Sequence, residues 1–383
     1  MNQPEKTLET RALCKAFPGV CALDNVDFSV KAGEVHAVVG ANGAGKSTLA
    51  KILSGAYHPD SGEVYLFGEK ITINSPLEAK LKGIICTYQE VDTALVRYLS
   101  VAENVMINKL VSSPGAVVNW NEINNKAAEY LRQVDLDVDV HKQLVELTLS
   151  QKQKVVIAQA LEQKAKFLIL DEPTAPLSLR EVDQLFALIR NLTKTGIGII
   201  YISHRMTEVF AIADRISVMR DGKLVATLNA KETNPDEIVF HMLQKTFDQV
   251  EKHDIRKNLE SNEIVFETRN LCRPPLVNDI SFKVHAGEVL GITGLVGAGK
   301  TELARVLFGA DKLLSGDMRL GGEPIQVTSP AAAVEQGLML VPEERRRQGV
   351  LVDFNITQNL TIPSLKSFTK AGVLNQRQEK TAP

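Results

Sequence analysis

Residues 40–47 read GANGAGKS and combine glycines, a lysine and a hydroxyl in the spacing GxxxxGK[ST]. Glycines let a backbone curl so that successive N–H groups point inward, and a helix that follows adds the partial positive charge of its N-terminus. In such a loop Lys46 reaches the β- and γ-phosphates of a nucleotide, and the Ser47 hydroxyl binds Mg²⁺. A glycine-rich start of an ordinary helix is the alternative. The predicted loop residues are Gly40, Ala41, Asn42, Gly43, Ala44, Gly45, Lys46, Ser47 and Thr48.

Two adjacent acids, Asp171 and Glu172, follow the apolar run FLIL at residues 167–170. Side chains alternate along a strand, so neighbouring acids at its end can take different tasks. Asp171 can hold Mg²⁺ through water, and Glu172 can polarise the attacking water as a general base. A buried strand that ends in a helix N-cap is the alternative, which the phosphate loop upstream disfavours.

The sequence around Lys46 recurs around Lys300. GEVHAVVGANGAGKSTL at residues 33–49 recurs as GEVLGITGLVGAGKTEL at residues 287–303, which disfavours a chance match in either copy. By the logic of the repeat, roughly 115–120 residues of the second copy lie beyond the last residue, so we expect one complete unit and the front of another. The second loop is predicted to bind phosphate too, through Gly294, Gly297, Gly299, Lys300 and Thr301.

The elements that must position these residues alternate along the first unit. An apolar run at residues 34–40 leads into the first loop, and residues 46–53 have helical character. Residues 165–170 and 196–202 are short apolar runs typical of buried parallel strands, and residues 182–192 show helical spacing. Strands that alternate with helices predict an α/β fold around a mostly parallel sheet.

Between the two copies lies a polar, charged stretch without apolar periodicity, which predicts a short linker. The predicted organisation is a first domain over residues 1–245, a linker over 246–262 and a second, partial domain over 263–383.

Composition narrows the class of protein. A chain of 383 residues, 44% apolar and 23% charged with a formal charge of −2, is globular, and it is not a basic chain built to coat nucleic acid. Its four cysteines are scattered without CxxC spacing, which is typical of a reducing compartment. The first residues lack the apolar core of a signal peptide, and no apolar run approaches the length of a membrane span.

Four segments together resemble the ATP-binding-cassette ATPases: GANGAGKST, LILDEPTAPLS, YISHR and DRISVMRDGK. The tandem arrangement, FPGVCALDNVDFSV, GLVGAGKTEL and VPEERRRQGV are similar to the sugar-importer ATPases of the ribose, galactose and xylose type, from about Leu8 to the end of the chain. The resemblance implies a P-loop NTPase fold with a mostly parallel core sheet, an antiparallel β subdomain and a helical subdomain. It implies that the second cassette is incomplete, and that the nucleotide is ATP with Mg²⁺.

The resemblance also implies roles for three residues that look ordinary by themselves. Phe17 stacks on adenine, Gln89 links Mg²⁺ and the attacking water to a transmembrane partner, and His204 contacts the γ-phosphate. Without the resemblance, a lone histidine after a strand is more often a satisfied core or surface residue. The implied catalytic residues are thus Glu172, His204 and Gln89, and the implied metal ligands are Ser47, Gln89 and Asp171.

The sequence departs from the family pattern in the signature segment and in the second copy. In the family, the signature segment begins a helix that faces the nucleotide bound by the opposing cassette. This signature segment falls at Leu147, Thr148, Leu149, Ser150 and Gln151. Thr148 replaces the usual serine, and Ser150 stands where a glycine lets the backbone approach phosphate, so its Cβ is expected to weaken that contact. The second copy has no aromatic residue at the position of Phe17, and it has Glu343 in place of Gln89.

The function that the resemblance implies is ATP hydrolysis coupled to uptake of a monosaccharide or sugar-like solute. The partners would be transmembrane permease subunits and, through them, an extracytoplasmic sugar-binding protein, with the chain at the cytoplasmic face of the membrane. Cassettes of this family face each other head to tail, so we expect slow hydrolysis unless two chains pair through their first cassettes.

Two alternatives remain open. One is a catalytically incompetent, truncated remnant of such a subunit. The other is a soluble tandem-cassette factor that acts on ribosomes or DNA, which the short linker and the charge of −2 disfavour. No nucleic-acid partner is predicted.

Overall fold

A computed structural model describes residues 6–87, 94–112, 117–174, 177–243, 263–295, 297–342, 348–370 and 372–381. The chain divides into two compact units, Met1–Glu251 (unit 1) and Lys252–Pro383 (unit 2). The predicted linker, residues 246–262, lies outside the described residues, so the domain boundaries stay predictions. Gln89 and Glu343 also lie outside them.

Unit 1 is built on a six-stranded sheet in the order β10-β9-β3-β8-β7-β6. Only β10 runs antiparallel to its neighbour, and β6, β7, β8, β3 and β9 pair in parallel. The predicted mostly parallel core sheet is confirmed. All five parallel strands therefore point their carboxyl ends to one edge, where the loops that follow them meet. The strands are β3 (Val35–Gly40), β6 (Ile84–Thr87), β7 (Phe167–Asp171), β8 (Gly198–Ile202), β9 (Arg215–Arg220) and β10 (Lys223–Asn229).

A second, antiparallel sheet of unit 1 has the order β2-β1-β4-β5. Its apolar face shares one core with the central sheet and with α1 (Lys46–Leu53), in which Leu8, Leu49 and Ile169 are buried together. The helix that opens at the predicted phosphate loop is thus held between two sheets. The strands are β1 (Thr7–Phe17), β2 (Val20–Lys31), β4 (Ser61–Leu66) and β5 (Glu69–Ile71).

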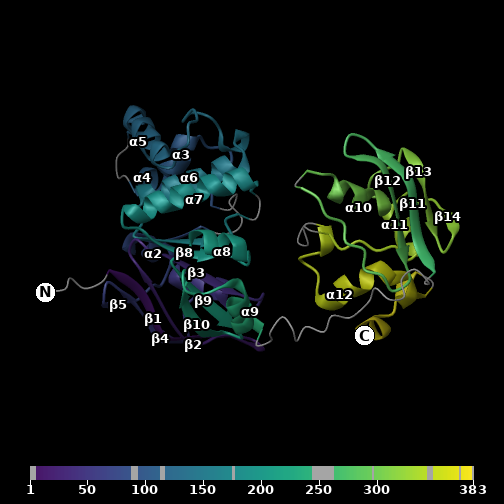
Figure 1. The fold of residues 1–383 in the computed structure, drawn as a ribbon, viewed down its shortest axis with the longest axis horizontal. Helices are drawn as coiled ribbons and strands as arrows, with labels where there is room; N and C mark the ends of the chain where they lie inside the picture. Colours follow the sequence, from purple (N-terminus) through teal and green to yellow (C-terminus); the bar gives the residue numbers. More distant parts are fainter. Residues whose placement is uncertain are drawn as a thin grey trace. The chain divides into compact units, whose positions relative to one another are not determined.

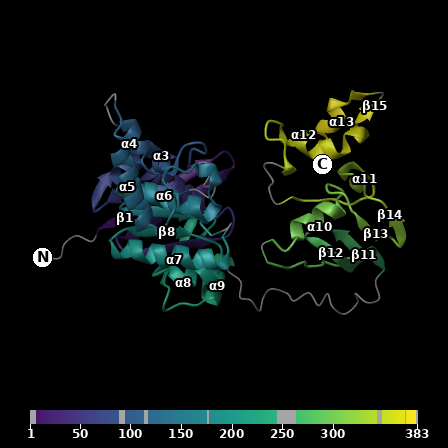
Figure 2. The ribbon, with the colours of Figure 1, turned by 90° about the horizontal axis from the view of Figure 1, so that it is seen from above.

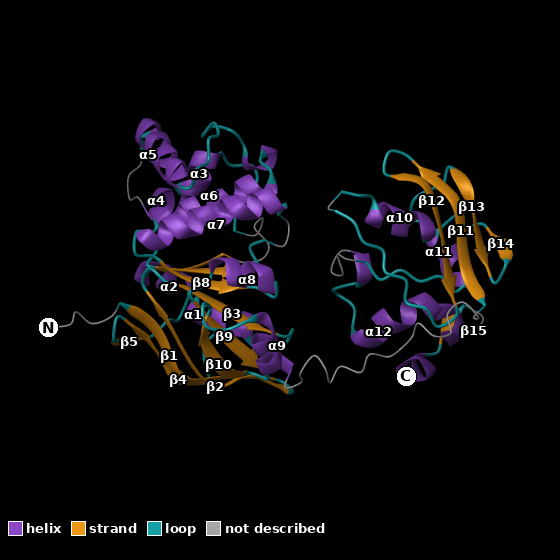
Figure 3. Ribbon diagram, in the orientation of Figure 1, coloured by secondary structure: helices purple, strands orange, loops and turns teal. Residues whose placement is uncertain are grey.

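Helices α3 to α7 gather on one side of the central sheet (Figures 1 and 3). In α7, Val182, Leu185, Phe186 and Ile189 recur every three or four residues and form the buried stripe that faces the sheet. Seen from above in Figure 2, α3, α5 and α6 lie side by side. The helices of unit 1 are α1, α2 (Pro76–Lys82), α3 (Val101–Val105), α4 (Ile107–Ser112), α5 (Trp120–Gln133), α6 (Leu149–Glu162), α7 (Leu179–Lys194), α8 (Met206–Ile212) and α9 (Pro235–Leu243), with a short 3₁₀ turn, η2 (Leu144–Glu146).

Unit 2 repeats the antiparallel sheet, in the order β12-β11-β13-β14. Its register matches that of unit 1: Thr268 faces Met318 as Thr10 faces Val64. In Figure 2 helices α10 and α11 lie beside this sheet. The elements are β11 (Ile264–Arg273), β12 (Val277–His285), α10 (Lys300–Leu307), β13 (Ser315–Leu320), β14 (Glu323–Ile325), α11 (Pro330–Glu335), α12 (Ile356–Thr361), η7 (Ile362–Phe368), β15 (Thr369–Lys370), β16 (Val373–Leu374) and α13 (Gln376–Lys380).

The counterpart of β3 in unit 2, residues 289–293, is not a strand. Val289 is 90% exposed and Ile292 is 49% exposed, whereas every residue of β3 is buried. In unit 1, β8 and β9 hydrogen-bond to the two edges of β3. The described part of unit 2 contains no strand that pairs with 289–293, and these residues, which correspond to β3, are exposed.

Candidate active site

The first phosphate loop joins β3 to α1, as predicted. β3 ends at Gly40 and α1 begins at Lys46, with Ser47 and Thr48 in its first turn. Gly45 has a φ of +101°, and a Cβ built on it would lie 2.5 Å from the carbonyl oxygen of Ala22. Only glycine satisfies both the left-handed backbone and this close approach.

Lys46 extends back over the loop that precedes it. Its Nζ donates hydrogen bonds to the carbonyl oxygens of Gly40, at 2.8 Å, and Ala41, at 2.9 Å, and the residue is only 7% exposed. Burial lowers the pKa of this ammonium group, and the nearby carboxylates of Glu172 and Asp171 oppose that shift. The ammonium group is therefore held at the loop by two backbone carbonyls, at the start of a helix, where the helix N-terminus also favours an anionic phosphate.

Asp171 ends β7 next to the start of α1. Burial raises the pKa of Asp171, and a hydrogen bond from the Ser47 hydroxyl to its carboxylate partly offsets that shift. The two groups supply adjacent oxygens, the ligand type that Mg²⁺ prefers, and a magnesium ion beside phosphates needs only one or two protein ligands. No group of three or more His, Cys, Asp or Glu that could hold a metal occurs among the described residues.

Glu172 and His204 meet although they follow different strands. Glu172 Oε1 lies 2.9 Å from Nδ1 of His204, and the Glu172 N–H donates to the carbonyl oxygen of Ile202 at 2.9 Å. Glu172 has a φ of +48°, a left-handed conformation that is uncommon for a non-glycine residue and concentrates at functional sites. β7 and β8 are neighbours in the sheet, and their parallel pairing brings these two ends together.

The signature segment opens α6. Thr148 is the N-cap: its hydroxyl accepts from the N–H of Gln151 at 3.3 Å, and the Gln151 side chain accepts from the N–H of Thr148 at 2.9 Å. Ser150 sits in the first turn and hydrogen-bonds to Glu181, which lowers the pKa of that carboxyl after the larger contribution of Ser178. Thr148 thus keeps the capping role of a serine, and the hydroxyl of Ser150 is turned to a neighbouring carboxylate.

Phe17 ends β1 and is 37% exposed. Its ring packs edge-on against Tyr57, with centroids 5.4 Å apart. Asp60 braces the strand end, because its carboxylate accepts from Lys15 Nζ at 2.7 Å and from the N–H of Ala16 at 2.6 Å. Tyr57 and Asp60 were missed by the sequence reasoning, and no motif marks them.

The second phosphate loop has the same backbone in a different setting. Gly297 and Gly299 are left-handed, α10 begins at Lys300 with Thr301 in its first turn, and Lys300 Nζ donates to the carbonyl oxygens of Gly294 and Leu295. Lys300 is exposed, however, whereas Lys46 is buried.

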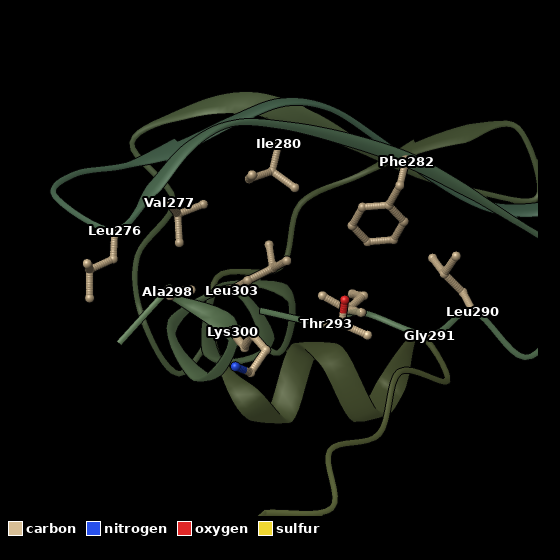
Figure 4. A pocket seen from close by; sticks show the side chains of 12 residues that line it. Leu276, Val277, Ile280, Phe282, Leu290, Gly291, Thr293, Ala298, Lys300 and Leu303 are labelled. Atoms are coloured by element: carbon tan, nitrogen blue, oxygen red, sulfur yellow. The ribbon is translucent and has the colours of Figure 1, made fainter. Parts of the chain in front are cut away.

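A pocket of about 380 Å³ lies beside this loop, between β12 and residues 290–293 (Figure 4). Val277 and Phe282 line it. At the matching positions of unit 1, Leu23 and Phe28 are buried in one core with Ile200, Ile202 and Met219 of β8 and β9. The pocket is therefore interior space that strand residues occupy in unit 1, rather than a separate ligand site.

In unit 1 the phosphate loop and the Glu172–His204 pair share one edge of the sheet, because β3, β8 and β7 are consecutive neighbours. A phosphate held by the loop would thus lie at the edge where Glu172 and His204 meet. Fold and site together define an ATPase of the P-loop class.

Comparisons with known proteins agree. The family model described as ABC transporter matches residues 23–175 and 277–379. A ribose import ATP-binding protein, RbsA 3, of Rubrobacter xylanophilus is 43% identical over 94% of this chain and 72% of its own length. A putative ribose/galactose/methyl galactoside import ATP-binding protein of Albidiferax ferrireducens is 42% identical over 96% of this chain and 73% of its own length.

Among solved structures, the ADP conformation of an ATP-binding cassette of an ABC transporter matches with a TM-score of 0.55 and 27% identity, over 63% of this chain and 99% of that chain. The chain belongs to the ABC transporter family, as one of its ATP-binding ATPases. The predicted fold, ATP binding and resemblance are confirmed. In the part of the chain that the structure describes, no helix has both the length and the apolar character needed to cross a bilayer.

Proposed function

We propose that this ATPase drives import of a monosaccharide or sugar-like solute through membrane permease subunits, with the chain bound peripherally at the cytoplasmic face. The observation that carries the proposal is the 43% identity, over 94% of the chain, to a protein named for ribose import. An extracytoplasmic sugar-binding protein would deliver the solute to the permease.

Within unit 1 we assign each residue a role from its contacts. Lys46 binds the β- and γ-phosphates, and Phe17, backed by Tyr57, stacks on the base. Ser47 and Asp171 would hold Mg²⁺, which offsets phosphate charge when bound. Gln89 is assigned to link this centre to the permease, on the resemblance alone.

Glu172 acts as the general base. Its carboxylate accepts a proton from water as the water oxygen attacks the γ-phosphorus, and the bond to the leaving ADP oxygen breaks. With Glu172 ionised, the 2.9 Å contact makes Nδ1 of His204 the donor, which orients the carboxylate. Nε2 can donate to the γ-phosphate at the same time only in the imidazolium form, in which both ring nitrogens carry a proton.

In this family the phosphate loop of one cassette closes on the signature segment of another, so we propose that two chains pair through their first units. Turnover per chain is then expected to rise with protein concentration, because mass action populates the pair. Steady-state phosphate release over a dilution series measures this.

Ser150→Glu should reduce the increase of turnover with protein concentration, because it places a negative charge against the opposing nucleotide. The exposed Ser315→Glu in unit 2 is the matched control and should leave the rise intact. Turnover that is independent of concentration would contradict pairing.

The permease assignment has its own test. Affinity purification of the tagged chain from detergent-solubilised membranes of its native host is expected to recover integral membrane subunits of a permease, identified by mass spectrometry. Recovery of ribosomal proteins or nucleic acid instead, without a membrane subunit, would support the soluble-factor alternative.

A further inference from the structure

A second carboxylate, that of Glu208 on α8, is buried, with only 8% of the residue exposed. Its Oε2 accepts hydrogen bonds from the hydroxyls of Thr174, at 2.5 Å, and Tyr201, at 3.1 Å. Ser203 Oγ donates to the same oxygen at 3.5 Å, and Arg205 Nη1 donates to Oε1 at 3.0 Å. The buried carboxylate of Glu208 therefore accepts hydrogen bonds from four side chains.

These donors come from the two segments that carry the candidate catalytic pair. Thr174 lies two residues after Glu172, and Ser203 and Arg205 lie on either side of His204. Glu208 thus ties the segment after β7 to the segment after β8, at the point where Glu172 and His204 must stay 2.9 Å apart. Both segments leave regular strands here, so the sheet no longer fixes their separation.

The cluster is built for an ionised carboxylate. A buried carboxylate is costly unless donors surround it, and here a guanidinium and three hydroxyls do so. Burial, and after it the charge of Glu208, raise the pKa of Tyr201, so its phenol stays protonated and remains a donor. Replacing the carboxylate with an amide leaves one acceptor oxygen for four donors and sets an NH2 donor against the others.

We propose that Glu208 is a positioning residue for hydrolysis: it holds the segments of Thr174 and Arg205 so that Glu172 and His204 keep their geometry beside the γ-phosphate. The proposal rests on the roles proposed above for Glu172 and His204. The contacts of Glu208 given by the structure go to residues 174, 201, 203 and 205, and none of these belongs to the loop of residues 40–48. The rate of the chemical step should therefore depend on Glu208, while nucleotide binding should not.

The test is steady-state ATP hydrolysis by the full chain carrying Glu208→Gln, with kcat and KM measured separately. A misplacement of about 1 Å at a reacting centre costs up to about 100-fold, so kcat is expected to fall about 10- to 100-fold with KM changed less than about twofold. Glu237→Gln is the matched control. It removes the same kind of bond, from Thr233 Oγ1 at 2.6 Å, on α9, and should leave kcat unchanged.

A double-mutant cycle separates positioning from a merely structural role. Thr174→Val deletes one donor and is expected to lower kcat as well. Adding it to Glu208→Gln should cost little more, because the bond between Thr174 and the Glu208 carboxylate is already disrupted in that variant. Glu172→Gln serves as reference: if it retains wild-type hydrolysis, the proposed role of Glu172 is wrong.

If Glu172→Gln abolishes hydrolysis but Glu208→Gln keeps its kcat, or raises KM alone, the role of Glu208 is overturned. Should Glu208→Gln fail to fold, Thr174→Val and Tyr201→Phe decide the question. Lowered kcat with an unchanged unfolding temperature supports positioning, and unchanged kcat in both variants contradicts it.

Discussion

Replacing Lys46 with alanine is expected to abolish the ATP-dependent rise in the unfolding temperature of unit 1. The ammonium group sits at 2.8 and 2.9 Å from two loop carbonyls, in the place where phosphate oxygens would bind. With ATP bound, the ammonium group would donate hydrogen bonds to phosphate oxygens. Hydrogen bonds to charged groups contribute about 1.5–3 kcal/mol each, so losing two is expected to weaken ATP binding about 100- to 10,000-fold. Stabilisation by a ligand follows the ratio of its concentration to its Kd and falls accordingly. Thermal unfolding at several ATP concentrations measures the effect.

Lys300→Ala is the matched control for that experiment. It makes the same deletion in the second loop, where the lysine is exposed, and should preserve most of the shift. Unchanged ATP affinity in Lys46→Ala would remove the assignment of the nucleotide site to unit 1.

The second large effect is expected from Glu172→Gln, which should lower hydrolysis about 100- to 10,000-fold, the usual contribution of a general base. Glutamine is the same size and its side-chain oxygen can still accept from His204 Nδ1, but it cannot take a proton from water. ATP binding should persist, because Lys46 and the loop amides are untouched. Phosphate release measures the loss, and the ATP-dependent shift in unfolding temperature checks binding.

Glu129→Gln, on the exposed side of α5, controls for removal of a surface charge and should hydrolyse ATP normally. If Glu172→Gln hydrolyses ATP at the wild-type rate, another group activates the water. The left-handed backbone of Glu172 would then need a different explanation.

The phosphate loop was predictable from sequence because its chemistry is local. Glycines with left-handed φ, a lysine and a hydroxyl within eight residues determine the turn, the helix start and the charge together. The acid pair was predictable because Asp171 and Glu172 close a run of buried strand residues. Both features depend on neighbours along the chain.

Features formed by residues far apart in sequence were not predictable. Thr174 and Glu208 are separated by a whole helix and strand, and only the pairing of β7 with β8 brings them together. Tyr57 contacts Phe17 through the fold of the antiparallel sheet, and neither residue carries a pattern that predicts the other. The exposure of Val289 was not predictable either, because its sequence is typical of a buried strand, and in the described part of unit 2 no strand pairs with it.

The two phosphate loops have nearly the same hydrogen-bond donors, but the residues that lead into them differ in their neighbouring strands. Residues 35–40 pair with β8 on one side and with β9 on the other, which restricts their backbone without a ligand. Residues 289–293 have no strand alongside in the described part of unit 2, so a nucleotide that binds there must also reduce the chain's freedom. Fixing a backbone residue costs about 1–2 kcal/mol of conformational entropy. As ATP is titrated into this chain, we therefore expect the loop around Lys46 to fill first, and the loop around Lys300, if it binds nucleotide, to fill only at higher concentration.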